Sequence, residues 1–160
     1  MKKLVNISLV AALLAVSLNL AAQKVQKNKT VSASTERAPQ HVSAYLGRSS
    51  MSDGLIPKRT FDSLLKQGLT AKDSLGNLYK VSGFTFGYGE RNLYEDSIGN
   101  MMVLTDYLTE YCPGDTISLA MSRNIFYKTK PGDTAYFDNI KVAVPGKQLV
   151  ARSMRFVLTK

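Results

Sequence analysis

An alternation of apolar and polar side chains predicts strands over much of the chain. Apolar residues recur at about every second position in four segments: 79–88, 101–111, 135–142 and 152–158. A period of two places successive side chains on opposite faces of a strand, and these segments are rich in β-branched and aromatic residues. A shorter alternation of Val42, Ala44 and Leu46 predicts a first strand nearer the N-terminus.

Two further segments carry helix signals. The segment 57–67 places Phe61, Leu64 and Leu65 on one face of a helix. It starts with proline and is followed by glycine, which are typical residues at the two ends of a helix. Ser118 is a suitable N-cap for a second helix, although the apolar positions after it do not form one clean stripe. We therefore predict a mainly β, β-sandwich-like domain with one or two short helices.

Two turn sequences each occur twice. The pentapeptide Asp-Ser-Leu/Ile-Gly-Asn occupies 73–77 and 96–100, and Pro-Gly-Asp-Thr occupies 113–116 and 131–134. Aspartate can accept hydrogen bonds from backbone amides ahead of it and glycine tolerates positive φ, so we expect the pentapeptides to be hairpin loops. A calcium site is disfavoured, because calcium takes about six oxygen ligands and each pentapeptide has one carboxylate.

The N-terminal region predicts export. Two lysines precede an apolar stretch that ends in small residues, so we interpret 1–22 as a signal peptide cleaved near Ala22. A permanent anchor is disfavoured, because the uninterrupted apolar core is shorter than the roughly 20 residues that a spanning helix needs. The segment 23–41 is predicted to be a flexible basic linker, and 42–160 a folded β-rich domain. The mature protein would then be soluble in the periplasm or outside the cell.

Charge and composition narrow the classes of partner. The 160 residues include 21 Lys plus Arg against 12 Asp plus Glu, a net charge of +9, which falls to +7 without Lys2 and Lys3. A basic exported protein meets acidic proteins, anionic polysaccharide or membrane surfaces, so nucleic acid is not an expected partner. The basic linker is suited to peripheral membrane contact. One Cys and one His exclude a Cys/His zinc site, an iron–sulfur cluster and a disulfide framework, and we expect no cofactor.

The candidates for catalysis are few. Cys112 and His41 are the one conceivable thiol–imidazole pair, but no pattern places them together, and a lone Cys is commonly a buried small hydrophobe. We expect Cys112 to be buried; exposure or a bond to a second chain are its alternatives.

Paired acids offer a second catalytic hypothesis. Glu95 with Asp96, or Asp106 with Glu110, could suggest glycoside hydrolysis, which needs two carboxyl groups at a defined separation. Short loops and strand faces explain these residues better. We predict no catalytic, cofactor-binding or metal-binding residue, and hence no enzyme.

An aromatic stripe on the strand 79–88 has two interpretations. Phe84, Phe86 and Tyr88 lie on one strand face, where they could stack against sugars or a partner. Packing into the core is the commoner reason for such a stripe, and it is the interpretation we favour.

The order of these elements resembles the C-terminal periplasmic domain of the GldM/PorM family of gliding-motility and type IX secretion proteins. The resemblance covers nearly all of 42–160, and its most specific part is KPGDTAYFDNIKV at 130–142, followed by Pro145-Gly146 and a last strand. Weaker support comes from GLIPK at 54–58, GLTA at 68–71 and YKVSGF at 79–84. This sequence differs in having a predicted signal peptide where the family has a membrane-anchoring helix and a large preceding region.

The resemblance implies a compact β-rich domain without enzymatic activity. In the family this domain is the membrane-distal end of an elongated dimer and contacts ring components near the outer membrane. We therefore expect a non-catalytic cell-envelope interaction module, an accessory or adaptor of gliding or type IX secretion assemblies, whose partner is an envelope protein or a second copy. The alternative is a binder of envelope glycan or another anionic ligand through the basic surface. No partner-binding residue is predicted from the sequence.

Overall fold

The computed structural model describes Pro39 and residues 41–160. The predicted signal peptide and nearly all of the predicted linker lie outside these residues. In the described part, eight strands and two helices follow in this order: β1 (Ser43–Leu46), β2 (Gly54–Pro57), α1 (Lys58–Leu65), β3 (Leu69–Lys72), β4 (Leu78–Glu95), β5 (Met101–Cys112), α2 (Leu119–Lys128), β6 (Thr134–Val144), β7 (Lys147–Ala151) and β8 (Met154–Thr159). The prediction of a mainly β domain with one or two short helices is confirmed.

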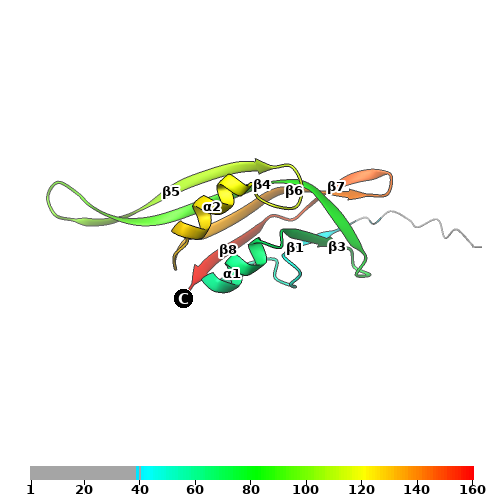
Figure 1. The fold of residues 1–160 in the computed structure, drawn as a ribbon, viewed down its shortest axis with the longest axis horizontal. Helices are drawn as coiled ribbons and strands as arrows, with labels where there is room; N and C mark the ends of the chain where they lie inside the picture. The colour runs from blue at the N-terminus through cyan, green and yellow to red at the C-terminus, as the bar shows by residue number, and fades with distance from the viewer. Residues whose placement is uncertain (1–38, 40) are drawn as a thin grey trace, which may run out of the picture. The chain divides into compact units, whose positions relative to one another are not determined.

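The strands form one curled sheet in the order β1-β3-β4-β6-β8-β2 (Figure 1). β5 pairs with β4, and β7 pairs with β6. All pairs are antiparallel except β2 with β8, which are parallel and join the first third of the domain to its last strand. Both pentapeptides form the predicted hairpin loops, between β3 and β4 and between β4 and β5.

β4 is long because it changes partners along its length. It pairs with β3 at Leu78 and Tyr79, and with β5 from Phe84 onward. Its register with β6 shifts on both sides of Gly83, which marks a bulge. A bulge bends a strand and increases its local twist. It therefore lets β4 pair with β3 at one end and with β5 and β6 farther along.

The core lies inside this curl and is rich in aromatic rings. Phe84, Phe86 and Tyr88 are buried, as predicted for the stripe on β4. The Phe137 ring of β6 lies 5.8 Å and 5.2 Å from the first two ring centroids and 6.1 Å from that of Phe156 on β8. Burial of each such ring stabilises the fold by about 2 kcal/mol.

Both helices add buried side chains to this core. α1 buries Phe61 and Leu65, and it follows Pro57, which occupies the N-cap position. α2 buries Ile125 alone, and its predicted cap is confirmed: Ser118 Oγ accepts a hydrogen bond from the Met121 amide at 3.1 Å.

Three strands have no range in the prediction, and one of them, β3, is implied only by the expected hairpin loop at 73–77. The segment around Asp53-Gly54 reads as a loop in the sequence, yet β2 starts at Gly54 and pairs with β8. β7 occupies 147–151, between the predicted turn and the predicted last strand, which begins at Met154 instead of Arg152. β2 and β7 are four and five residues long. Their own sequences carry no strong strand pattern, and they adopt strand structure because they pair with neighbouring strands.

Candidate interaction surfaces on the open sheet face and the β4–β5 arm

One face of the sheet packs on the core and the opposite face is open. Thr85 and Gly87 alternate with the three buried aromatic residues of β4, so they belong to the open face. Residues paired directly across strands share a face, which adds these register partners on β5 and β6: Tyr111, Thr109, Asp138 and Tyr136. An antiparallel sheet commonly has one packed and one solvated face. Here the solvated face is not flat.

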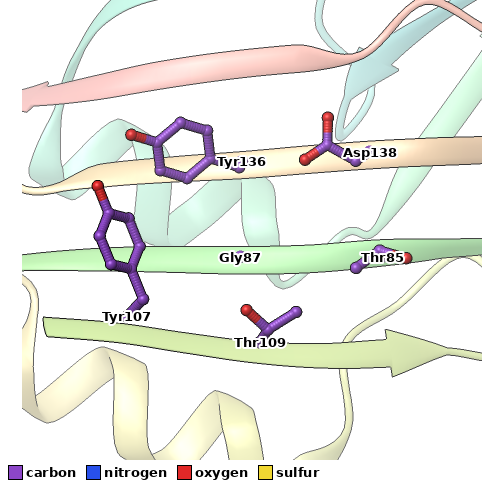
Figure 2. Close-up of a pocket in the computed structure, with 6 residues that line it drawn as sticks. All are labelled: Thr85, Gly87, Tyr107, Thr109, Tyr136 and Asp138. Atoms are coloured by element: carbon purple, nitrogen blue, oxygen red, sulfur yellow. The ribbon is translucent and has the colours of Figure 1, made fainter.

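A groove of about 330 Å³ crosses this face over three neighbouring strands. It is lined by Thr85 and Gly87 from β4, Tyr107 and Thr109 from β5, and Tyr136 and Asp138 from β6. Figure 2 shows the two tyrosine rings together at one end, Thr85 and Asp138 at the other, and Gly87 between them. The groove therefore combines ring faces with hydroxyl and carboxylate oxygens.

Two glycines of β4 are covered by tyrosine rings from β5. A Cβ placed on Gly83 would lie 2.5 Å from the Tyr111 hydroxyl oxygen, and one on Gly89 would lie 3.1 Å from Cε1 of Tyr107. A side chain at Gly83 would require the Tyr111 ring to move, and one at Gly89 would press closely on the Tyr107 ring. Packing thus explains both glycines.

Gly87 has no comparable packing reason. Its φ does not lie in the left-handed region, and a Cβ there would meet Cβ of Tyr136 at 3.4 Å, an ordinary contact. Glycine in a strand interior costs roughly 0.5–1 kcal/mol relative to alanine, and often marks close approach of a ligand or another backbone. The missing side chain at Gly87 leaves the floor of the groove open.

The polar end of the groove holds an unused carboxylate. Asp138 is exposed, and its side chain makes no hydrogen bond or ion pair with the described part of the chain. At the other end, the ring centroids of Tyr107 and Tyr136 lie 6.4 Å apart, with their planes at 45°. Both features are accessible to a bound molecule.

Beyond the groove, the β4–β5 hairpin continues as a two-stranded arm, defined here as residues 90–106. Figure 1 shows the tip of this hairpin extending past both helices. Its exposed large apolar side chains are Leu93, Tyr94, Ile98, Met101, Met102, Val103 and Leu104. Leu93 and Val103 are paired on one face, and Leu104 lies on the other. Both faces of the arm thus carry exposed apolar side chains.

Polar contacts hold the two strands of the arm in register. Asp106 accepts hydrogen bonds from Asn92 Nδ2 at 2.8 Å and from the Tyr94 hydroxyl at 3.0 Å. The bond from Asn92, followed by that from Tyr94, lowers the pKa of Asp106 below its ordinary value, because both stabilise the charged carboxylate. The same pairing raises the pKa of Tyr94.

A buried carboxylate fixes the base of the arm. Asp133, from the second Pro-Gly-Asp-Thr turn, is buried and accepts hydrogen bonds from the Arg91 and Lys130 amides, both at 2.9 Å, and from the Tyr88 hydroxyl. Lys130 Nζ in turn contacts Glu90 at 3.0 Å. Burial raises the pKa of Tyr88, and the hydrogen bond to Asp133 adds to this effect. These bonds tie the turn before β6 to the point where the arm begins.

The structure separates the residues of the thiol–imidazole hypothesis. Cys112 is buried, as expected, and pairs with Phe84 at the end of β5. Burial raises the pKa of its thiol to about 11, with a smaller contribution from Glu110. His41 is exposed and lines a different pocket, beside β1 and the β7–β8 turn.

The paired acids also have other roles. Asp96 accepts hydrogen bonds from the Asn100 and Ile98 amides at 2.8 Å and 3.0 Å, and the first of these contributes most to lowering its pKa. Asp106 and Glu110 are four residues apart on one strand, so their Cα atoms are separated by about 13 Å. Glycosidase carboxyl groups lie about 5–9.5 Å apart. The geometry therefore gives the hydrolase hypothesis no support.

Sequence reasoning missed both surfaces. It considered sugar or partner stacking only for the aromatic stripe of β4, which it favoured as core and which the structure buries, and it did not consider the accessible rings of the groove, Tyr107 and Tyr136. One signal was present: the Phe-Gly-Tyr-Gly run at 86–89 interrupts a strand with glycines that have no turn to form.

Within residues 41–160, no helix is long and apolar enough to cross a membrane. The same part of the chain holds no group of three or more His, Cys, Asp or Glu side chains placed to bind a metal ion. Neither protein-family models nor the curated proteins give a match to this sequence.

Proposed function

We propose that this protein is a non-catalytic, exported interaction module of the cell envelope, and that its β4–β5 arm is the contact surface for a protein partner. The observation that carries the proposal is the exposure of apolar side chains on both faces of the arm. Leu93 and Val103 are 65% and 52% exposed on one face, and Leu104 is 46% exposed on the other. Contiguous exposed apolar surface of this kind marks interaction sites.

Backbone geometry supports the same surface. β5 pairs with β4 alone among the described strands, so its outer edge presents free amide and carbonyl groups. An open edge is a template for pairing with a further strand. An isolated two-stranded hairpin is also marginally stable in water, and a partner covering it would supply the missing packing.

The resemblance to the GldM/PorM C-terminal domain supplies the class of partner. We assign the protein an accessory or adaptor role in gliding or type IX secretion assemblies, in which the arm binds a ring component or a second copy of the chain. The run 130–142 that carries the resemblance forms the turn and strand that anchor the arm through Asp133. Export through the predicted signal peptide would place the protein in the same compartment.

An affinity pulldown from the native envelope tests this proposal. The tagged full-length protein is used at low and at high salt, beside two variants. Leu93→Thr with Val103→Thr removes apolar surface from the arm and places β-branched threonine, which favours strands, at both positions. Val150→Thr is the matched control, because Val150 is 63% exposed on β7, away from the arm.

We expect ring components to remain bound to the wild type and to the control at high salt, because a packed apolar interface is only weakly screened. The arm variant should lose them. Loss of every partner at high salt, or equal retention by the arm variant, would contradict the proposal.

A further inference from the structure

We propose that the groove over Gly87 binds a pyranose ring of a glycan chain. This site goes beyond the protein contact proposed above, because its six lining residues lie outside the arm of residues 90–106. It also differs from recognition through general basic charge, since the groove offers rings, hydroxyl groups and one carboxylate.

The floor of the groove fits a flat ring lying across the sheet. Gly87 leaves the centre of the middle strand without a side chain, while residues of β5 and β6 form the two walls (Figure 2). Neither the backbone conformation nor close packing requires glycine at this position. A ligand that approaches the backbone closely gives a physical reason for it.

The lining chemistry matches a sugar in two ways. The axial C–H groups of a pyranose pack on aromatic faces, and the Tyr107 and Tyr136 rings supply such faces at one end. Sugar hydroxyl groups donate to carboxylates, and Asp138 is an exposed acceptor that the described chain leaves unused. Thr85 and Thr109 can both donate and accept there.

A cationic ligand fits this site less well. Asp138 and tyrosine rings could in principle hold an ammonium or guanidinium group. Two basic residues flank the groove on the same face, however. Arg155 is the register partner of Tyr136, and Lys141 Nζ lies 5.6 Å from the Tyr111 ring centroid. These charges disfavour a cation and leave a neutral or acidic glycan as the complementary occupant.

Isothermal titration calorimetry of the full chain tests the site. The probes are hexasaccharides of β-1,4-linked N-acetylglucosamine, of β-1,4-linked glucose and of α-1,6-linked mannose, together with soluble peptidoglycan fragments. A hexalysine peptide serves as the cationic probe. Measurements at low and high salt separate stacking from charge attraction.

Two variants probe the groove from different sides. Gly87→Val fills the floor with a residue that favours strands, and its melting temperature is compared with that of the wild type to check the fold. Asp138→Ala removes an exposed carboxylate that supports no other side chain. Asp115→Ala is the matched control, because Asp115 is also exposed and its side chain makes no hydrogen bond or ion pair with the described residues.

We expect at least one glycan probe to bind the wild type at both salt concentrations. Affinity should fall by about tenfold or more in both groove variants and stay unchanged in the control and in the arm variant. The proposal is overturned if no glycan probe binds, if Gly87→Val binds as tightly as the wild type, or if hexalysine binds instead. The arm variant, Leu93→Thr with Val103→Thr, leaves the groove intact. The pulldown therefore tests the protein contact and the calorimetry tests glycan binding, so either proposal can fail without the other.

Discussion

At the level of single residues, two copies of one turn have different tasks. Asp115 and Asp133 occupy the same place in Pro-Gly-Asp-Thr, but the first is exposed and the second is buried. Asp133 satisfies two backbone amides and the hydroxyl of Tyr88. The sequence motif is identical, so the difference arises from the strand that each turn meets. A buried acceptor with three donors is costly to alter, because each donor left unpaired loses its hydrogen bond without regaining water.

Asp133→Asn is therefore expected to lower the free energy of unfolding by about 2–3 kcal/mol, since the amide group cannot accept from all three donors. Asp115→Asn, in the twin turn, should change it by less than about 0.5 kcal/mol. Urea unfolding followed by circular dichroism measures both. Equal effects of the two substitutions would show that Asp133 does not anchor the arm.

At the level of elements, α2 combines a modest packed face with a side-chain cap, since Met121 and Phe126 pack against the core beside buried Ile125. Only Ile125 among its ten residues is buried. Most helical stability in proteins comes from a packed apolar face, and local terms such as caps add to it. The hydrogen bond from the Met121 amide to Ser118 is the main such term at its N-terminus.

Removing this cap should destabilise the domain. We expect Ser118→Ala to cost about 1 kcal/mol in thermal or urea unfolding, because one amide of the first turn loses its acceptor. Ser122→Ala, inside the same helix, should be neutral or slightly stabilising, as alanine favours helices. A cost at Ser122 that equals or exceeds the cost at Ser118 would contradict this account.

The local sequence pattern predicts most of the helices and strands, but it does not predict the groove or the exposed arm. The long strands, both helices and the hairpin loops are predicted because their periodicity and turn residues lie within short segments. β2 was missed because its partner, β8, lies about one hundred residues later, at a register of Gly54 with Phe156. The groove was missed for a similar reason: it needs three strands side by side before Gly87 becomes a floor.

At the level of the whole molecule, the Cys112 thiol and the Tyr88 hydroxyl make the free energy of unfolding depend on pH in the alkaline range. Burial raises the pKa of Cys112 to about 11 from an ordinary value of 9.0, and the pKa of Tyr88 is raised as well. A raised native pKa favours the protonated form in the folded state. The resulting stability is present at neutral pH and is lost as the pH rises through the interval between the unfolded and native values.

Between pH 9 and 11, the thiol of Cys112 ionises in the unfolded chain before it does so in the native protein. We expect this group alone to remove about 2 kcal/mol of stability by pH 11. Comparing the wild type with Cys112→Ala by urea unfolding at pH 8 and pH 11 isolates the effect, because packing losses are common to both pH values. Parallel declines in the two proteins would contradict the assignment.

The parallel pairing of β2 with β8 also sets an order of events during folding. β2 leads directly into α1, yet its one strand partner forms from residues 154–159 at the end of the chain. Contacts between distant segments form late, because loop closure must precede them. β2 therefore gains its strand partner only after the last residues of the chain are available. In a chain still being synthesised, β2 would lack its strand partner until residues 154–159 are released.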